Sequence, residues 1–113
     1  MSAMTDPNPS DHAFRALADP TRRAIVALLA ERDMTIGDVA ANFAMTRPAV
    51  AKHLRILEAG AVIRVEARGR ERINRLDPAG LAAVRHWIEE IDRFWSARLG
   101  QLKDAIEAED NDG

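Results

Sequence analysis

Three proline-containing helix starts divide this chain and limit the folds open to it. Each places a polar residue one or two positions before a proline, in Asp19-Pro20, Thr46-Arg47-Pro48 and Asp77-Pro78. The polar side chain can accept a hydrogen bond from an unpaired N–H of the first turn, and proline fits there because it has no N–H to leave unpaired. The sequence therefore predicts helices from about residues 20, 47 and 78, with a further helical turn or two before Asp19.

A shorter helix is predicted from Thr35 to Phe43, directly before the helix that starts at Thr46. Thr35 and Asp38 have the spacing of a capping box. Only a tight turn separates this helix from the next one, which runs to Glu58 and is stopped by Gly60. The pattern predicts two short helices that pack closely against each other.

The helix from Thr46 to Glu58 has two different faces. At 100° per residue, Val50, Leu54 and Leu57 fall on one side of it, whereas Lys52 and Arg55 fall on the other side. His53 lies at the boundary between these sides. We expect one face to be buried in the core and the other to present cations to a partner.

The charge distribution singles out the same region. Residues 47–75 hold eight cations against three anions, a net charge of +5 in a chain whose total is −2. The acidic segments on both sides, residues 1–46 and 76–113, carry net charges of −2 and −5. A basic block between acidic ones is typical of a surface that binds a polyanion, although a solvated cationic hairpin is an alternative.

A β-hairpin is predicted over residues 62–76, where "VIRVEA" and "RERINRL" alternate around Arg68-Gly69-Arg70. The order of elements is then helix, short helix, turn, helix with a cationic face, and basic hairpin. This order predicts a mainly α fold with a small β-hairpin (α+β), namely a winged helix-turn-helix with a long C-terminal helix.

The last helix is predicted to run from Pro78 to about Ala108. Its apolar residues recur every three or four positions over a length of about 45 Å, which is longer than so small a domain needs. We expect part of this helix to pack on its own domain and part to form a homodimer interface. The expected interface residues, from the first and last helices, are Phe14, Leu17, Leu81, Val84, Trp87, Ile88, Ile91, Phe94, Trp95, Leu99 and Leu102.

Composition sets further expectations. The chain has no cysteine, which excludes disulfides, thiolate metal sites and cysteine nucleophiles. No apolar run is long enough to span a membrane and the N-terminus has no secretory signal pattern, so we expect a cytoplasmic protein with no membrane partner. We expect a disordered N-terminus over residues 1–10, one domain over residues 11–108 and a disordered acidic tail over residues 109–113.

At this point the motifs "LADPTRRAIVALLA", "TIGDVAANFAMTRPAVAKHLRILEAGAVI" and "RGRERINRL" together resemble the ArsR/SmtB family of bacterial transcriptional regulators, over roughly residues 12–95. The resemblance implies a dimeric DNA-binding repressor that places its 47–58 helix in the major groove of double-stranded operator DNA and its 62–76 wing on the flanking backbone. A helix fits that groove, and Lys and Arg can reach guanine edges or phosphates. The expected DNA-binding residues are Thr46, Arg47, Pro48, Ala49, Ala51, Lys52, His53, Arg55, Arg68 and Arg70.

Within that set, Arg47, Lys52 and His53 are expected near bases, Arg55 near phosphate, and Arg68 and Arg70 at the wing tip. The chain departs from the family pattern in three ways, at four positions. Ala51 replaces a serine of the recognition helix, which predicts an altered sequence preference. Ala44 replaces a glycine, which predicts a positive φ or a shifted turn. Arg72 and Asn74 replace aromatic residues of the second wing strand, which predicts a more mobile wing.

Other functions stay open at this stage. The family's cysteine metal site is absent, because its positions hold Thr35 and Gly37, but His86 with Glu89, Glu90 or Asp92 could serve a metal-responsive repressor. Trp87, Phe94 and Trp95 could line an effector pocket, although their helical spacing is equally typical of core. We expect no cofactor and no metal, and the sequence does not name an effector. The residues show no catalytic grouping or phosphate loop, so we expect no enzyme, and a winged helix that binds an acidic protein remains an alternative.

Overall fold

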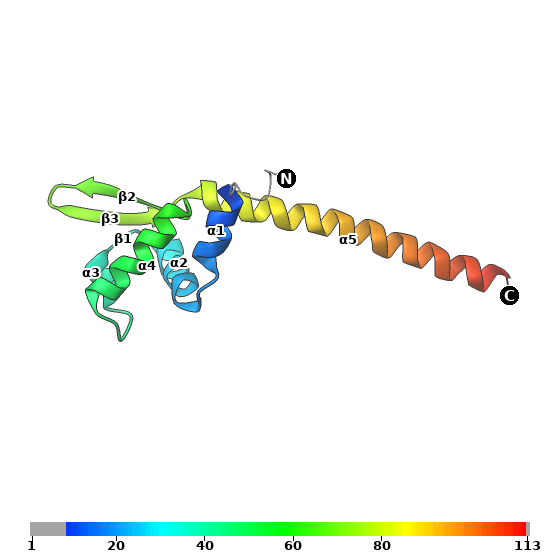
Figure 1. The fold of residues 1–113 in the computed structure, drawn as a ribbon, viewed down its shortest axis with the longest axis horizontal. Helices are drawn as coiled ribbons and strands as arrows, with labels where there is room; N and C mark the ends of the chain where they lie inside the picture. Colours follow the sequence, from blue (N-terminus) through cyan, green and yellow to red (C-terminus); the bar gives the residue numbers. More distant parts are fainter. Residues whose placement is uncertain (1–8, 113) are drawn as a thin grey trace, which may run out of the picture.

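The computed structural model describes residues 9–112, which form a helical body, a β-hairpin and one long projecting helix (Figure 1). The elements in chain order are α1 (Pro9–Leu17), α2 (Pro20–Glu31), β1 (Met34–Thr35), α3 (Ile36–Ala40), α4 (Arg47–Ala59), β2 (Ile63–Arg68), β3 (Glu71–Leu76) and α5 (Pro78–Asp112). This arrangement confirms the predicted fold class, a mainly α winged helix-turn-helix with a long C-terminal helix.

The predicted helix starts are confirmed by their hydrogen bonds. Asp19 Oδ2 accepts from the Arg22 N–H at 3.0 Å, and this bond lowers the pKa of the Asp19 carboxyl. Thr35 and Asp38 form the complete capping box. Thr46 Oγ1 accepts from the Ala49 N–H at 3.3 Å, and Asp77 Oδ1 accepts from the Ala79 N–H at 3.0 Å.

The junction between α1 and α2 shows why two arginines follow the Asp-Pro pair. Arg22 donates from Nε to the Ala16 carbonyl at 2.7 Å and from Nη2 to the Arg15 carbonyl at 3.0 Å. Arg23 donates from Nη1 to the Leu17 carbonyl at 2.9 Å. Carbonyls of the last helical turn have no partner inside the helix, and cations are favoured there by the helix dipole. These two cations therefore hold α1 against α2.

The core lies where α1, α2, α3 and α4 meet the base of the hairpin. Its largest fully buried side chains are Ile25, Val39, Val50, Leu57, Val62 and Ile63. The α4 residues expected to face inward, Val50, Leu54 and Leu57, are all buried. Helix α3 ends at Ala40, three residues earlier than predicted, and Phe43 reaches the core from the turn that follows.

The hairpin has the predicted position, and the described residues add a strand that the sequence did not indicate. Strands β2 and β3 pair antiparallel from Ile63↔Leu76 to Arg68↔Glu71, and Gly69 turns the chain with a φ of 64°. The two-residue strand β1 pairs with the other edge of β3. Asn74 is buried on β3, where its Nδ2 donates to the Met34 carbonyl of β1 at 3.1 Å. This bond fixes the base of the wing.

Of the two alternatives expected for Ala44, a positive φ or a shifted turn, the structure excludes the positive φ. Ala44 does not have a positive φ; among the described residues other than glycine, only Ala61 has one, at 55°. The Val62 N–H bonds to the Leu57 carbonyl and the Ala61 N–H to the Glu58 carbonyl. These two bonds form a Schellman motif, which needs a left-handed residue directly after the helix cap. The strain therefore lies at the C-terminus of α4 and not in the turn before it.

Both predicted chain-end boundaries need correction. Helix α1 already begins at Pro9, so residues 9 and 10 are not part of an unstructured N-terminus, and residues 1–8 lie outside the described residues. Helix α5 continues to Asp112, so the predicted tail from residue 109 is wrong as far as residue 112, and Gly113 lies outside the described residues. The polar composition of these last turns favours a helix end, yet no glycine or proline interrupts the helix between residue 109 and Gly113.

Candidate nucleic-acid interface

The outer face of α4 presents the cations that the sequence predicted. Lys52 and Arg55 are exposed, and Val50, Leu54 and Leu57 bury the opposite face. Ala49 and Ala51 are half-buried beside the cations. Their small side chains protrude little from the helix, so another surface can approach the α4 backbone closely.

The first turn of α4 is exposed at Thr46, Arg47 and Pro48. The Arg47 guanidinium lies over Gly37 of α3, since a Cβ added to Gly37 would be only 2.8 Å from Arg47 Nη2. Thr46 uses its hydroxyl oxygen to cap α4. Arg47 at this end of the helix therefore also lies against α3, whereas Thr46 caps α4 itself.

His53 occupies a different position from the other expected contact residues. It is half-buried, and its Nδ1 lies 3.4 Å from Nη1 of Arg22, the residue that holds α1 against α2. The imidazole thus sits in the seam between α4 and the α1–α2 junction. A neutral ring can accept a hydrogen bond from Arg22 there, whereas a protonated ring would face a like charge.

The wing separates its cations into two groups. Arg68 and Arg70 are exposed at the tip, on either side of Gly69. Arg75 is paired instead, because its Nη1 lies 3.1 Å from Glu66 Oε1 and its Nε lies 3.7 Å from Asp33 Oδ2. Arg64 approaches the same Glu66 carboxylate at 3.9 Å. The free positive charge of the wing is therefore concentrated toward the tip.

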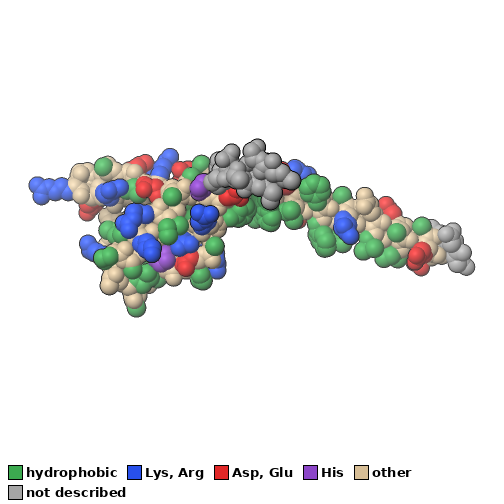
Figure 2. Space-filling model, in the orientation of Figure 1, with side chains coloured by type: hydrophobic (Ala, Val, Ile, Leu, Met, Phe, Trp, Pro, Cys, Tyr) green, Lys and Arg blue, Asp and Glu red, His purple; other side chains and the backbone are tan. Residues whose placement is uncertain are grey.

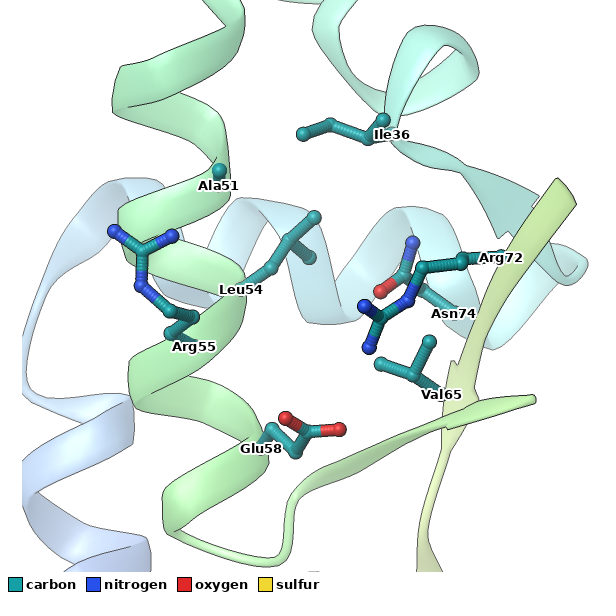
Figure 3. A pocket seen from close by; sticks show the side chains of 8 residues that line it. All are labelled: Ile36, Ala51, Leu54, Arg55, Glu58, Val65, Arg72 and Asn74. Carbon is teal, nitrogen blue, oxygen red and sulfur yellow. The ribbon is translucent and has the colours of Figure 1, made fainter. Parts of the chain in front are cut away.

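A groove of about 300 Å³ lies between α4 and the wing (Figure 3). Its lining residues are Ile36, Ala51, Leu54, Arg55, Glu58, Val65, Arg72 and Asn74. In Figure 3, Arg72 extends from β3 toward α4, and Glu58 extends from α4 toward the strands. The exposed Arg72 thus lies between the cations of α4 and those at the wing tip.

Sequence reasoning did not place Arg72 in the interface. The signal that could have found it is the strand register. Arg72 pairs with Ala67 and Asn74 pairs with Val65, so Arg72 shares a face of the hairpin with the groove-lining residues Val65 and Asn74. Only the pairing register fixes that face, and the polar second strand did not reveal it.

Figure 2 shows the resulting charge pattern on one face of the molecule. Lys and Arg side chains gather over the hairpin and α4, at the end of the molecule opposite the C-terminus of α5. Hydrophobic side chains follow one edge of the projecting α5. The cationic surface and the apolar stripe therefore occupy separate parts of the chain.

The residues expected in a subunit interface fall into two groups: some pack on their own domain, and the others are exposed to solvent. Leu17, Leu81 and Val84 pack partly against the core of their own domain, and the Phe14 and Trp87 rings meet edge to face with centroids 5.3 Å apart. Beyond Trp87, which is 46% exposed, the large apolar residues of α5 are open to solvent. They are Ile88, Ile91, Phe94, Trp95, Leu99, Leu102 and Ile106.

The histidine of α5 has an acidic neighbour. His86 Nε2 lies 3.1 Å from Glu90 Oε1, one turn along the helix. Within the described residues, no three His, Asp or Glu side chains come together as a metal site would require. In the same part of the chain, no helix combines the length and the apolar composition needed to cross a bilayer.

Comparisons with known proteins agree on one family. A model of the bacterial regulatory proteins of the arsR family matches residues 19–61. The chain is 40% identical over 102 residues to the HTH-type transcriptional regulator Rv2034 of Mycobacterium tuberculosis, an alignment that covers 90% of this chain and 92% of the relative. It is 42% identical over 59 residues to the transcriptional repressor SdpR of Bacillus subtilis, covering 52% of this chain and 66% of SdpR.

Solved structures show the same likeness. The crystal structure of the ArsR family transcriptional regulator RHA00566 superposes with a TM-score of 0.73 at 34% identity. This superposition covers 79% of the present chain and 98% of the other.

Proposed function

The chain belongs to the ArsR family and is a transcriptional regulator, and on that premise we propose that it acts as a homodimeric repressor that binds operator DNA. The observation that carries the proposal is the two-sided α4. Its apolar face is buried in the core, its opposite face exposes Lys52 and Arg55, and the cationic wing lies beside it. A helix held in this way can enter a major groove while the wing follows the backbone.

The proposed contacts follow from where each side chain lies. Lys52 and Arg47 approach base edges from α4, and Ala49 and Ala51 allow close approach and apolar contact with thymine methyl groups. Arg55, Arg68 and Arg70 neutralise phosphates. Thr46 and Pro48 shape the first turn of α4. Half-buried His53 supports the helix on the side of the α1–α2 junction, and only its exposed edge reaches DNA.

Two copies are proposed because each α4 reads only a few base pairs. A two-fold dimer would place two recognition helices on successive major-groove faces of a palindromic site. The exposed apolar residues of α5 supply the surface for such pairing. Repression is proposed because the relative SdpR is named a transcriptional repressor.

DNA binding is tested by fluorescence anisotropy with the DNA upstream of the protein's own gene, over a range of salt concentrations. We expect affinity to fall steeply with salt, with a log-log slope of about −0.9 for each phosphate neutralised. Lys52→Ala and Arg55→Ala should weaken binding without changing the oligomeric state. Arg93→Ala is the matched control, because it removes the same charge from an exposed position of α5 opposite the apolar stripe.

Two results would contradict the proposal. If the protein binds no upstream fragment at low salt, the proposed DNA-binding face is wrong. The same holds if Arg93→Ala weakens DNA binding as much as Arg55→Ala does. An acidic protein captured by the same cations would then become the better hypothesis.

A further inference from the structure

The groove between α4 and the wing has a helical wall and a hairpin wall (Figure 3). The helical wall is one stripe of α4 with the spacing i, i+3, i+4 and i+7, which extends over about 10 Å. It consists of Ala51, Leu54, Arg55 and Glu58. The hairpin wall is the face that the strand register gives to Val65, Arg72 and Asn74. A molecule in this groove therefore touches both elements of the proposed DNA-binding face.

One end of the groove is apolar. Ile36 of α3 lies at this end, and Ala51 lies near it on α4 (Figure 3). Leu54 continues the apolar lining toward the middle, where Val65 adds a contact from β2. An aliphatic group placed here would be removed from water by side chains of three different elements, which favours its binding.

The other end carries opposite charges on its two walls. Glu58 extends from α4 toward the strands, and Arg72 extends from β3 toward α4 (Figure 3). Among the described residues, no ion pair joins either side chain to another group. Arg55 directs its guanidinium to the other side of α4, so Arg72 is the cation that faces the groove (Figure 3). This end therefore offers one cation and one anion to the same bound molecule.

Asn74 adds a fixed polar contact on the hairpin wall. Its side chain is buried, and its Nδ2 donates to the Met34 carbonyl at 3.1 Å. The amide oxygen lies on the side of the groove (Figure 3). Because the bond to Met34 holds the amide in place, this oxygen is an acceptor already oriented for a ligand N–H.

Size and charge together restrict what can bind. The groove encloses about 300 Å³, which holds about ten non-hydrogen atoms if each occupies the roughly 30 Å³ of a water molecule in the liquid. A simple anion would be repelled by Glu58, and a simple cation would be repelled by Arg72. A molecule that carries both charges at one end and an aliphatic group at the other matches the whole lining.

We propose that this groove binds a small zwitterion, an α-amino acid with an aliphatic side chain, and that the bound molecule prevents DNA binding. Its carboxylate pairs with Arg72, and its ammonium group donates to Glu58 and to the Asn74 oxygen. Its aliphatic side chain lies along Leu54 toward Ile36. The ligand is held mainly by its two charges, since charge-assisted hydrogen bonds are the stronger ones.

The effect on DNA binding follows from the position of the groove. The bound zwitterion neutralises Arg72 and fills the space between α4 and the wing, so DNA and ligand compete for one face. Each then lowers the apparent affinity of the other by the same factor. This competition rests on the DNA binding of the proposed function, whereas ligand binding by itself does not.

Isothermal titration calorimetry of the full-length protein without DNA tests the site alone. The probes are L-leucine, its isomer 6-aminohexanoate, 4-methylpentanoate and 3-methylbutylamine. The isomer separates the two charges by its aliphatic chain, and the last two probes are leucine without its ammonium group and leucine without its carboxylate. We expect a dissociation constant of about 1 mM or lower for leucine. The other three probes should bind at least about tenfold more weakly.

Four variants locate the binding of leucine. Arg72→Gln and Glu58→Gln each remove one pairing charge and should weaken binding about tenfold. Val65→Phe fills the groove without changing its charge and should weaken binding similarly; phenylalanine suits this half-buried strand position, so the fold is kept. Arg70→Gln is the matched control, because it removes a cation from the wing tip outside the groove lining, and it should bind leucine like the wild type.

Fluorescence anisotropy with upstream DNA tests the competition. Leucine at about ten times its dissociation constant should raise the apparent dissociation constant for DNA about tenfold or more. The effect should disappear in Val65→Phe, which keeps every cation of the DNA-binding face.

The outcomes separate the two parts of the proposal. The amino-acid site is wrong if leucine does not bind, if 4-methylpentanoate or 6-aminohexanoate binds as tightly, or if the Arg72, Glu58 and Val65 variants bind leucine unchanged. Leucine binding that leaves DNA affinity unchanged would refute the competition. Leucine binding in a protein that binds no DNA would keep the site and refute the proposed function.

Discussion

The contact between α4 and α5 depends on the missing side chain of Gly80. The Gly80 N–H, in the first turn of α5, donates to the Ala61 carbonyl at 2.8 Å. A Cβ at Gly80 would lie 2.5 Å from that carbonyl oxygen and 2.7 Å from the Gly60 oxygen. Both neighbours are backbone atoms of the motif that ends α4, so no side chain can rotate away to make room.

The cost of Gly80→Ala follows from these distances. Helix α5 must move away by about 1 Å to restore an ordinary distance between the added Cβ and the Ala61 carbonyl oxygen. This movement lengthens the Gly80 hydrogen bond beyond hydrogen-bonding distance. Leaving that buried N–H without an acceptor costs about 1–3 kcal/mol, and the disturbed packing costs a similar amount. The higher helix propensity of alanine offsets about 1 kcal/mol of this destabilisation. We expect a net destabilisation of about 2 kcal/mol or slightly more.

Urea denaturation followed by circular dichroism measures this change, at one fixed protein concentration because a dimer's stability depends on it. The midpoint should fall by roughly 1 M for a chain of this size. Gly100→Ala is the matched control on the same helix, since apart from its chain neighbours and the backbone of its own helix no described atom lies within 4 Å of the added Cβ. It should raise stability by up to about 1 kcal/mol through propensity alone.

The two substitutions therefore have opposite signs although they add the same methyl group to the same helix. Gly80→Ala should also weaken DNA binding without removing a cation, because it shifts α5 relative to α4. If both variants raise the urea midpoint, then α5 does not dock on the end of α4 in the way described, and the reasoning fails.

Four further outcomes are expected. Arg72→Ala should reduce the salt slope of DNA binding by about 0.9, as measured by anisotropy, because it removes one groove-facing cation. Asn74→Ala should lower the free energy of unfolding by about 2 kcal/mol in urea titrations, since the buried Met34 carbonyl loses its donor. Asp19 contributes stability that is present above its unfolded-state pKa and lost as pH falls through its lowered folded pKa, so the advantage of wild type over Asp19→Asn should shrink in acid denaturation below about pH 4. Ile91→Asp should raise the dimer dissociation constant more than about 100-fold by analytical ultracentrifugation, because the interface would bury an unpaired charge.

The cationic face shows where sequence reasoning succeeds and where it stops. Lys52 and Arg55 could be placed outward because helical periodicity alone puts them opposite Val50 and Leu54. Arg72 and Arg75 lie three residues apart on β3, so strand alternation puts them on opposite faces of the hairpin. Alternation cannot decide which face meets α4 or that Arg75 pairs with Asp33, because both depend on strand register and on contacts distant in sequence.

The sequence by itself determined the helix starts at Asp19, Thr35, Thr46 and Asp77, the hairpin turn at Gly69 and the two-sided α4. Each of these depends on hydrogen bonds or periodicity within a few residues, so local sequence is sufficient to specify it. Only the tertiary structure decided that β1 pairs with β3 through Asn74, that Ala61 takes the left-handed conformation under Gly80, and that His53 faces Arg22. These features join segments far apart in the chain, and whether such contacts form depends on how the whole domain packs.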